Sequence, residues 1–530
     1  HQHNKEGVLM KSAKLKVLLC LVVALMVCFS SVGAMACTAI YVGSGLTEDG
    51  STMFARSEDI SNSYNKLFYV SPAGNHTAGE EYNGCYGFSY TFTHDSYSYT
   101  AFRDDNGDAV DGVCPDCGGT HKHTPYEAAG TNEMGLSVSA TETIGGSDAV
   151  YELDPYTDTG IEEAEIVTVL LSEAATAKEA VDLLLNIYDT VGCSGGAGLF
   201  IADSTETWYI ENVTGHQYLA LKLSDSMVFA QPNMSIIGLI DLDDTENVIA
   251  SENLIGLAQQ AGTYVGDEEA NTIDYVASYN ADQSANSRMA SALKYFNAEA
   301  SDEPAASDYT ISNVDAEGNI VPMYTNITLD HPYTIADVVG YYDIAGIGSA
   351  SNLEVHIFQV FEEDSATNTV EWVAMDNAAW SAFVPYFPQL TTDTYEAYQL
   401  STLPAEFVEE EPESGLYYPA TRNVRNEAGE RVPVEGFRVF PENWADSMYW
   451  AADALSNLVL YGGLTEEQIA GVDAELAELQ QQCYDAYEQL KTAVAAAEDE
   501  EAAAQAATEI SASTAEAVHT AIVEMVNSLQ

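Results

Sequence analysis

The decisive stretch of this chain reads Ala34-Met35-Ala36-Cys37-Thr38-Ala39-Ile40-Tyr41-Val42. Upstream, Met10 opens a basic stretch that leads into an apolar run at residues 17–29, and Ala34-x-Ala36 is a small-residue cleavage site. This order is typical of a secretory signal. Cleavage after Ala36 would make Cys37 the first residue of an exported product.

An N-terminal cysteine combines a thiol and a free α-amine on one residue. The reference pKa of such an amine is about 7.7 to 8.0, so much of it is neutral near neutral pH. Covalent catalysis at a carbonyl needs a nucleophile with a base in reach, and an N-terminal amine is one recognised base. Cys37 is therefore the candidate nucleophile. Its alternative role is that of a lipoprotein cysteine, whose acylation would block both groups and leave a lipid-anchored, non-enzymatic surface protein.

Composition limits the classes of partner. The 530 residues include 83 acidic and 17 basic residues, a formal net charge of −66. Such a surface repels nucleic acid and anionic membranes, so we expect neither as a partner. The apolar run at residues 17–29 is shorter than the roughly 20 residues that span a bilayer, and no later run is longer. We expect a secreted or cell-surface bacterial protein with no integral membrane anchor after signal removal.

The chain divides into three expected parts. Residues 1–36 hold upstream residues and the signal, residues 37–455 a catalytic domain, and residues 456–530 an acidic tail of two or three helices. Apolar spacing at residues 161–191 predicts two packed helices, and strand patterns follow at 198–211, 217–223 and 226–233. Polar residues near 83–126 suggest an insert in the catalytic domain.

Two short strand patterns at residues 37–59 suggest a hairpin that brings Arg56 and Asp59 close to Cys37. Arg56 would favour the thiolate, and Asp59 would hold the α-amine of Cys37. The alternative is a surface Arg–Asp pair of little consequence.

Several motifs carry a family resemblance. Cys37-Thr38, Ala55-Arg56-x-Glu58-Asp59, Asn132-Glu-x-Gly135 before Ser139-Ala-Thr-Glu-Thr143, and Asp203-Ser-x-Glu-x-Trp208 are the segments concerned. Together they resemble the cysteine dipeptidases of peptidase family C69, N-terminal nucleophile hydrolases related to penicillin V acylases and bile salt hydrolases. The resemblance implies an α+β fold, an αββα sandwich, with the acidic helical segment added at its C-terminal end.

The resemblance also assigns roles to further residues. Asn132 would donate its amide to the developing oxyanion. Asn233 would be a second oxyanion or positioning amide, and Arg288, on a helix, would lie near the active site. Each has a plainer alternative: a turn residue for Asn132, a strand end for Asn233 and a solvated helix arginine for Arg288.

The implied activity is hydrolysis of dipeptides through a thioester on Cys37, with no cofactor required. The alternative enzyme is an amidase that cleaves N-acyl amino acids. A homo-oligomer is left open.

A separate motif suggests a metal site. Cys114-Pro-Asp-Cys117 is followed by His121 and His123, which resembles half of a zinc knuckle. A structural zinc and a disulfide involving Cys114, Cys117 or Cys85 carry equal weight, with free thiols as the third possibility.

Overall fold

The computed structural model describes residues 37–59, 65–84, 87–105, 126–142, 144–280, 288–300, 309–314, 320–324, 327–344, 346–363, 365–425 and 431–530. Its organising unit is the predicted hairpin, in which β1 (Thr38–Val42) pairs antiparallel with β2 (Thr52–Asp59). Thr38 lies opposite Ser57 in this register. The pairing therefore places Cys37 at the end of a sheet, beside the end of β2, as the sequence predicted.

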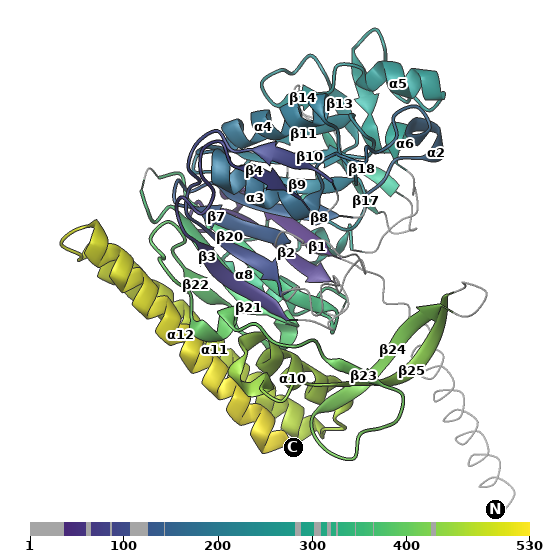
Figure 1. Ribbon diagram of the computed structural model, residues 1–530. Helices are drawn as coiled ribbons and strands as arrows, with labels where there is room; N and C mark the ends of the chain where they lie inside the picture. Colours follow the sequence, from purple (N-terminus) through teal and green to yellow (C-terminus); the bar gives the residue numbers. More distant parts are fainter. Residues whose placement is uncertain are drawn as a thin grey trace, which may run out of the picture.

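Two antiparallel sheets form the centre of the molecule (Figure 1). The six-stranded sheet has the order β12 (Val228–Gln231), β1, β2, β20 (Asn352–Val360), β21 (Thr369–Met375), β22 (Val384–Tyr386). The eight-stranded sheet has the order β14 (Val248–Ala250), β11 (Tyr218–Lys222), β10 (Thr207–Asn212), β9 (Ala197–Ala202), β8 (Ser137–Glu142), β7 (Glu127–Asn132), β6 (Tyr99–Asp104), β3 (Lys66–Ser71).

Alternation along the strands divides the core into layers. Ala39 and Tyr41 of β1 point into the cluster between the two sheets, whereas Ile40 and Val42 point to the outer face of the six-stranded sheet. This is the period-2 pattern of a strand buried on both faces. An aromatic group that includes Phe54, Phe200 and Phe358 fills the space between the sheets.

Helices cover the outer face of each sheet. On the eight-stranded sheet lie α3 (Glu163–Glu173) and α4 (Ala177–Thr190), the two helices predicted from apolar spacing. On the six-stranded sheet lie α7 (Ser291–Tyr295), α8 (Ile335–Tyr342) and parts of the C-terminal helices. The predicted αββα sandwich is therefore confirmed.

The C-terminal segment is a helical hairpin of α11 (Glu466–Ala495) and α12 (Glu500–Leu529) that runs along the domain (Figure 1). The expected boundary at residue 455 falls inside α10 (Met448–Tyr461). Leu455 of α10 shares one core cluster with Leu476 of α11, Val518 of α12 and residues between the sheets. The acidic helices thus pack against the domain through buried apolar residues.

The remaining strands are short or peripheral: β4 (Glu81–Asn83), β5 (Ser89–Thr91), β13 (Leu239–Asp241), β15 (Thr272–Asp274), β16 (Glu299–Ala300), β17 (Thr310–Val314), β18 (Ile320–Tyr324), β19 (Ile327–Thr328), β23 (Glu406–Val408), β24 (Tyr417–Arg425) and β25 (Arg431–Val439). The remaining helices are η1 (Ser44–Leu46), α2 (Asp148–Tyr151), α5 (Leu254–Ala261), α6 (Tyr275–Tyr279), η3 (Ala378–Trp380), α9 (Glu396–Gln399) and η4 (Trp444–Asp446).

The expected insert at residues 83–126 is partly wrong. Residues Tyr99–Asp104 form β6, which lies between β3 and β7 in the eight-stranded sheet. Tyr99 and Phe102 are both buried, on opposite faces of β6. A strand buried on both faces does not show the alternation of polar and apolar residues by which a strand is recognised in a sequence. Residues 106–125, the second half of the insert, lie outside the described residues.

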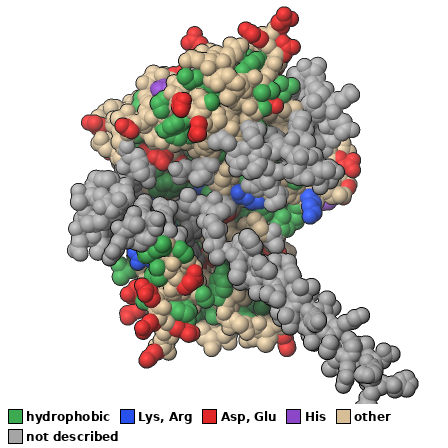
Figure 2. All heavy atoms as spheres, turned by 90° about the vertical axis from the view of Figure 1, so that its right-hand side faces the viewer, with side chains coloured by type: hydrophobic (Ala, Val, Ile, Leu, Met, Phe, Trp, Pro, Cys, Tyr) green, Lys and Arg blue, Asp and Glu red, His purple; other side chains and the backbone are tan. Residues whose placement is uncertain are grey.

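The surface agrees with the composition. Figure 2 shows acidic side chains toward both ends of one face of the molecule and a few Lys or Arg side chains nearer its middle. Across the described part of the chain, none of the helices combines the length and the apolar character that a bilayer crossing requires.

The packing of the C-terminal hairpin is testable at two neighbouring residues. Leu490 of α11 is fully buried in the cluster on the outer face of the six-stranded sheet, whereas Gln489 is exposed. We expect Leu490→Ala to lower the free energy of unfolding by about 2 to 5 kcal/mol because it leaves a cavity. Gln489→Ala, the control, should change it by less than about 0.5 kcal/mol. Urea unfolding measures both, and equal effects would contradict the packing.

Candidate active site

Cys37 lies at the entrance to β1, against the end of β2. The backbone N–H of Asp59 donates to Cys37 Sγ at 3.5 Å, and the residue is partly exposed. The next residue, Thr38, donates its backbone N–H to Ser57 Oγ at 3.3 Å. Cys37 is thus held at the end of β1, an interior strand of the six-stranded sheet.

Arg56 lies in the interior because it follows Phe54 by two residues and so shares the inner face of β2 with it. Its side chain is 2% exposed. Nη1 donates to the carbonyl oxygens of Ala128, at 3.2 Å, and Ala140. Nη2 lies 3.4 Å from Glu163 Oε1 and 3.7 Å from Glu58 Oε2. Arg56 is therefore a buried cation fixed between the sheets, and the alternative of a surface Arg–Asp pair is wrong.

Asp59 is the second group that β2 contributes. The register between β2 and β20 shifts between Glu58 and Asp59, and Asp59 then pairs with Asn352. Asn352 Nδ2 donates to Asp59 Oδ1. Burial raises the pKa of Asp59 to about 7, although hydrogen bonds from Asn352 and Ser57 and the charges of Arg288 and Arg56 favour the ionised form. This carboxyl group therefore titrates near neutral pH.

Arg288 joins the site from a distant part of the chain. Its Nη1 donates to the backbone oxygen of Cys37 at 2.6 Å and to Thr38 Oγ1 at 2.8 Å, and its Nη2 donates to Asn233 Oδ1 at 3.3 Å. The sequence placed Arg288 on a helix, but it lies in the turn before α7. Arg288 and Asn233 thus meet beside Cys37. Arg288 is not a solvated helix arginine, whereas Asn233 does follow the end of β12 and also bonds to Arg288.

Asn132 does not reach this site. Its Nδ2 donates to the carbonyl oxygens of Leu171 and Ala174, and its Oδ1 accepts from the backbone N–H groups of Met134 and Leu136. These contacts lie at the C-terminal end of α3, whereas Glu163, beside Arg56, begins that helix. A rise of 1.5 Å per residue separates the two ends by about 12 to 16 Å. The expected oxyanion role is therefore wrong, because Asn132 closes the β7–β8 turn and fixes it to α3.

The environment of the thiol contains opposing influences. Burial raises the pKa of Cys37, the Arg56 guanidinium lowers it, and the carboxylates of Asp59 and Glu163 raise it. A thiol in this position depends on nearby positive charge to form the thiolate at neutral pH.

Sequence reasoning missed two residues of the site. Asn352 is the first residue of β20, and only the strand pairing places it against Asp59. Glu163 is the first residue of α3, next to the capping box that Glu162 and Glu165 form. An acidic residue is expected at a helix start, so its type gives no indication that it contacts Arg56. No local signal distinguishes either residue.

The suggested zinc ligands Cys114, Cys117, His121 and His123, and Cys85, lie outside the described residues. The zinc or disulfide therefore stays a prediction. Over the ranges that the structure describes, no cluster of three or more His, Cys, Asp or Glu side chains could hold a metal ion.

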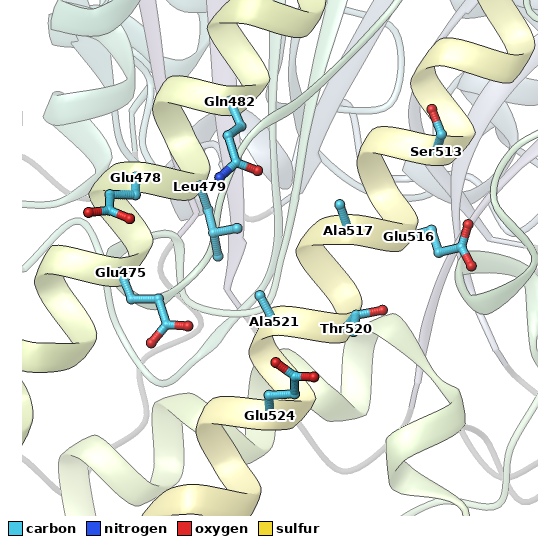
Figure 3. A pocket seen from close by; sticks show the side chains of 10 residues that line it. All are labelled: Glu475, Glu478, Leu479, Gln482, Ser513, Glu516, Ala517, Thr520, Ala521 and Glu524. Carbon is cyan, nitrogen blue, oxygen red and sulfur yellow. The ribbon is translucent and has the colours of Figure 1, made fainter.

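A groove of about 540 Å³ lies elsewhere, between α11 and α12 (Figure 3). Glutamates 475, 478, 516 and 524 line it, with Leu479, Ala517 and Ala521 between the helices. Ser513 and Thr520 also line it, but the Ser513 hydroxyl donates to the backbone oxygen of Ile510 and not to a glutamate. We therefore do not assign the active site there.

The role of Asn132 can be tested by stability. Asn132→Ala removes a buried amide that satisfies groups on two elements, and we expect it to lower the free energy of unfolding by about 2 to 4 kcal/mol. The rate at which iodoacetamide alkylates Cys37 should not change in the folded protein. Asn186→Ala, at an exposed position on α4, is the control. A stable Asn132→Ala variant with a large loss of hydrolysis would instead support the oxyanion role.

Comparisons with known proteins agree on one family. The sequence profile of Peptidase family C69 matches residues 36–407. A protein named "Probable dipeptidase B" from Streptococcus pyogenes serotype M18 is 32% identical over 388 residues, which cover 69% of this chain and 74% of that protein. A "Probable dipeptidase" from Salmonella dublin is 34% identical over 250 residues, 47% of this chain and 54% of that protein.

Among solved structures, a mutant of the conjugated bile acid hydrolase from Clostridium perfringens is 12% identical, with a TM-score of 0.27. The alignment covers 66% of this chain and 96% of that chain. The assignment depends on the sequence matches and not on this likeness. The region that matches the family profile begins one residue before Cys37. It includes Arg56, Asp59, Asn233, Arg288 and Asn352. The chain belongs to peptidase family C69.

Proposed function

We propose that this chain is an exported cysteine dipeptidase whose nucleophile is the Cys37 thiol. The observation that supports this most strongly is the convergence of Arg56, Asp59, Asn233 and Arg288 on Cys37. A thiol with cations and a carboxyl group close to it is the arrangement that acyl transfer needs. The names of the family relatives supply the substrate class.

The mature enzyme in this proposal begins at Cys37. Cleavage after Ala36 frees the α-amine, and Asp59, the carboxyl group next to the thiol, orients that amine. Ionised Asp59 accepts hydrogen bonds from the amine or ammonium group and keeps it in place as the base. Arg288, which is bonded to the carbonyl oxygen of Cys37, fixes the backbone of the nucleophile.

Hydrolysis then follows in two steps. Cys37 Sγ attacks the peptide carbonyl carbon, its proton passes to the α-amine, and the C–N bond breaks as the leaving amine takes that proton. The product is a thioester on Cys37. Water gives a proton to the α-amine as it attacks the thioester carbonyl, and the thiolate leaves and is reprotonated.

Asn233 is the proposed oxyanion donor. Its Oδ1 accepts from Arg288, which orients the amide so that Nδ2, the donor, lies on the other side of the group. An amide held in this way can donate to the charge that develops on the substrate oxygen without reorganising during the reaction. Asn132 has no part in this step.

Two measurements test the proposal as a whole. Mass spectrometry of protein purified from its host should find a free Cys37 at the N-terminus, and an acylated Cys37 would support the lipid-anchored alternative. A substrate panel should show higher kcat/KM for unmodified dipeptides than for N-acyl amino acids. The reverse order would favour the amidase.

We expect Cys37→Ser to retain the fold and lose at least about 10³-fold in kcat/KM, because the hydroxyl is a far weaker nucleophile than the thiolate. Cys193→Ser is the matched control, since Cys193 is buried and bonded to Asn212 and Thr214, and it should keep most activity. Dipeptide hydrolysis by the Cys37→Ser enzyme at the original rate would refute the assignment.

The pH dependence should report Asp59. Since its pKa is raised to about 7 and its ionised form holds the amine, kcat/KM should rise with pH through about 7. Asn352→Leu removes a hydrogen bond to the ionised form, so the pKa of Asp59 rises and the acidic limb moves to higher pH by about 0.5 to 1.5 units. Asn368→Leu, which removes a buried amide at the other end of the β20–β21 hairpin, should leave the limb in place.

A further inference from the structure

Glu163 is the charged neighbour of Arg56 that the proposed mechanism does not use. Its side chain is 2% exposed, and its Oε1 lies 3.4 Å from Arg56 Nη2. It is the first residue of α3, where the partial positive charge of a helix N-terminus favours a carboxylate. A buried carboxylate is costly without a cation nearby, and Arg56 is the cation that Glu163 contacts.

Glu58, the other carboxylate near Arg56, has a closer partner. Lys66 Nζ lies 2.5 Å from Glu58 Oε2 and 2.7 Å from Asp104 Oδ1, and Lys66 is fully buried. The Arg56–Glu58 separation is longer, at 3.7 Å. Lys66 therefore carries most of the charge pairing of Glu58, and Glu163 is the nearer acidic partner of Arg56.

The guanidinium is fixed from two directions. Nη1 donates to carbonyl oxygens in β7 and β8, which belong to the eight-stranded sheet. Nη2 faces Glu163 on the helix that covers the outer face of that sheet. Losing either contact would let the guanidinium move relative to β2 and hence relative to Cys37.

We propose that Glu163 is a positioning residue that fixes Arg56 and, through its negative charge, limits how strongly the site stabilises the Cys37 thiolate. The inference rests on the proposed role of Cys37 as nucleophile and adds a device that sets its ionisation. Burial raises the pKa of the Cys37 thiol above its ordinary value; the charge of Arg56 opposes that rise and the charge of Glu163 adds to it.

Several charged groups from different elements surround Cys37 and Glu163 and contribute to the ionisation of the thiol. Arg56, Glu58 and Asp59 come from β2, Arg288 from the turn before α7, and Glu163 from α3. Tyr126, which precedes β7, faces Glu163, and burial raises its pKa far enough that it is neutral at working pH. Glu163 raises the pKa of Cys37 while Arg56 lowers it, so removing the charge of Glu163 should lower that pKa.

The test is the pH dependence of Cys37 alkylation in the mature enzyme. Iodoacetamide reacts with the thiolate, and mass spectrometry of the peptide that contains Cys37 gives its rate separately from those of other cysteines. We expect Glu163→Gln, which keeps the shape and removes the charge, to shift the midpoint to lower pH by roughly 0.5 to 1.5 units. We also expect kcat to fall, because Arg56 loses a contact that fixes its position. KM should stay within about twofold, because in this proposal Glu163 acts through Arg56 and not on the substrate.

Glu173→Gln is the matched control. Glu173 ends the same helix and bonds to Tyr90 and Thr93, about 15 Å along α3 from Glu163. The pH midpoint of Cys37 alkylation in the Glu173→Gln variant should equal that in the unmodified enzyme. Glu163→Asp keeps the charge but withdraws it by one methylene, so it should shift the midpoint in the same direction by a smaller amount, and it provides the test if Glu163→Gln does not fold.

An unchanged or raised midpoint in the folded Glu163 variants would overturn the inference. This outcome is distinct from failure of the proposed function. If alkylation of Cys37 leaves dipeptide hydrolysis intact, Cys37 is not the nucleophile, whatever the midpoints are. If alkylation abolishes hydrolysis but the midpoint does not move, the nucleophile stands and the role of Glu163 is wrong.

Discussion

The burial of the Arg56 guanidinium between two sheets is the constraint on which the site depends. A cation removed from water is stable only when hydrogen bonds and opposite charges replace its solvation. Here the replacements come from β7, β8, β2 and α3 together. The two sheets and one covering helix must therefore be assembled before the charge beside Cys37 has its final position.

Cys37 is fixed in a different way, by backbone contacts at a sheet end. The pairing of β1 with β2 fixes the position of Cys37 next to the end of β2. Arg288, 251 residues away in the sequence, donates a hydrogen bond to the carbonyl oxygen of Cys37. Asn233, also bonded to Arg288, follows β12, the strand on the other side of β1. Cys37 is thus surrounded by the two strands that flank β1 and by the segment before α7.

The charge of the whole chain differs from the charge of the site. Acidic residues exceed basic ones by 66, yet two of the few basic residues, Arg56 and Lys66, are buried side by side with acidic partners at the inner face of β2 and β3. Arg288 bonds to the backbone oxygen of Cys37. The scarce cations are therefore used where burial makes a charge most effective, because the low dielectric of the interior strengthens each interaction.

The sequence by itself determined the hairpin at residues 37–59, the helices α3 and α4, the helical C-terminal segment and the candidates Cys37, Arg56 and Asp59. These depend on local periodicity and on residues close together in the chain, which a sequence displays directly. It did not determine that residues 99–104 form the strand β6 between β3 and β7, that Asn132 bonds to α3, or that Asn352 and Glu163 complete the site. Asn352 contacts a residue 293 positions away and Glu163 one 107 positions away, and the partners of Asn132 lie 39 and 42 positions away at one end of α3. Only the packing of the two sheets, with the strand register that it fixes, brings such groups within hydrogen-bonding distance.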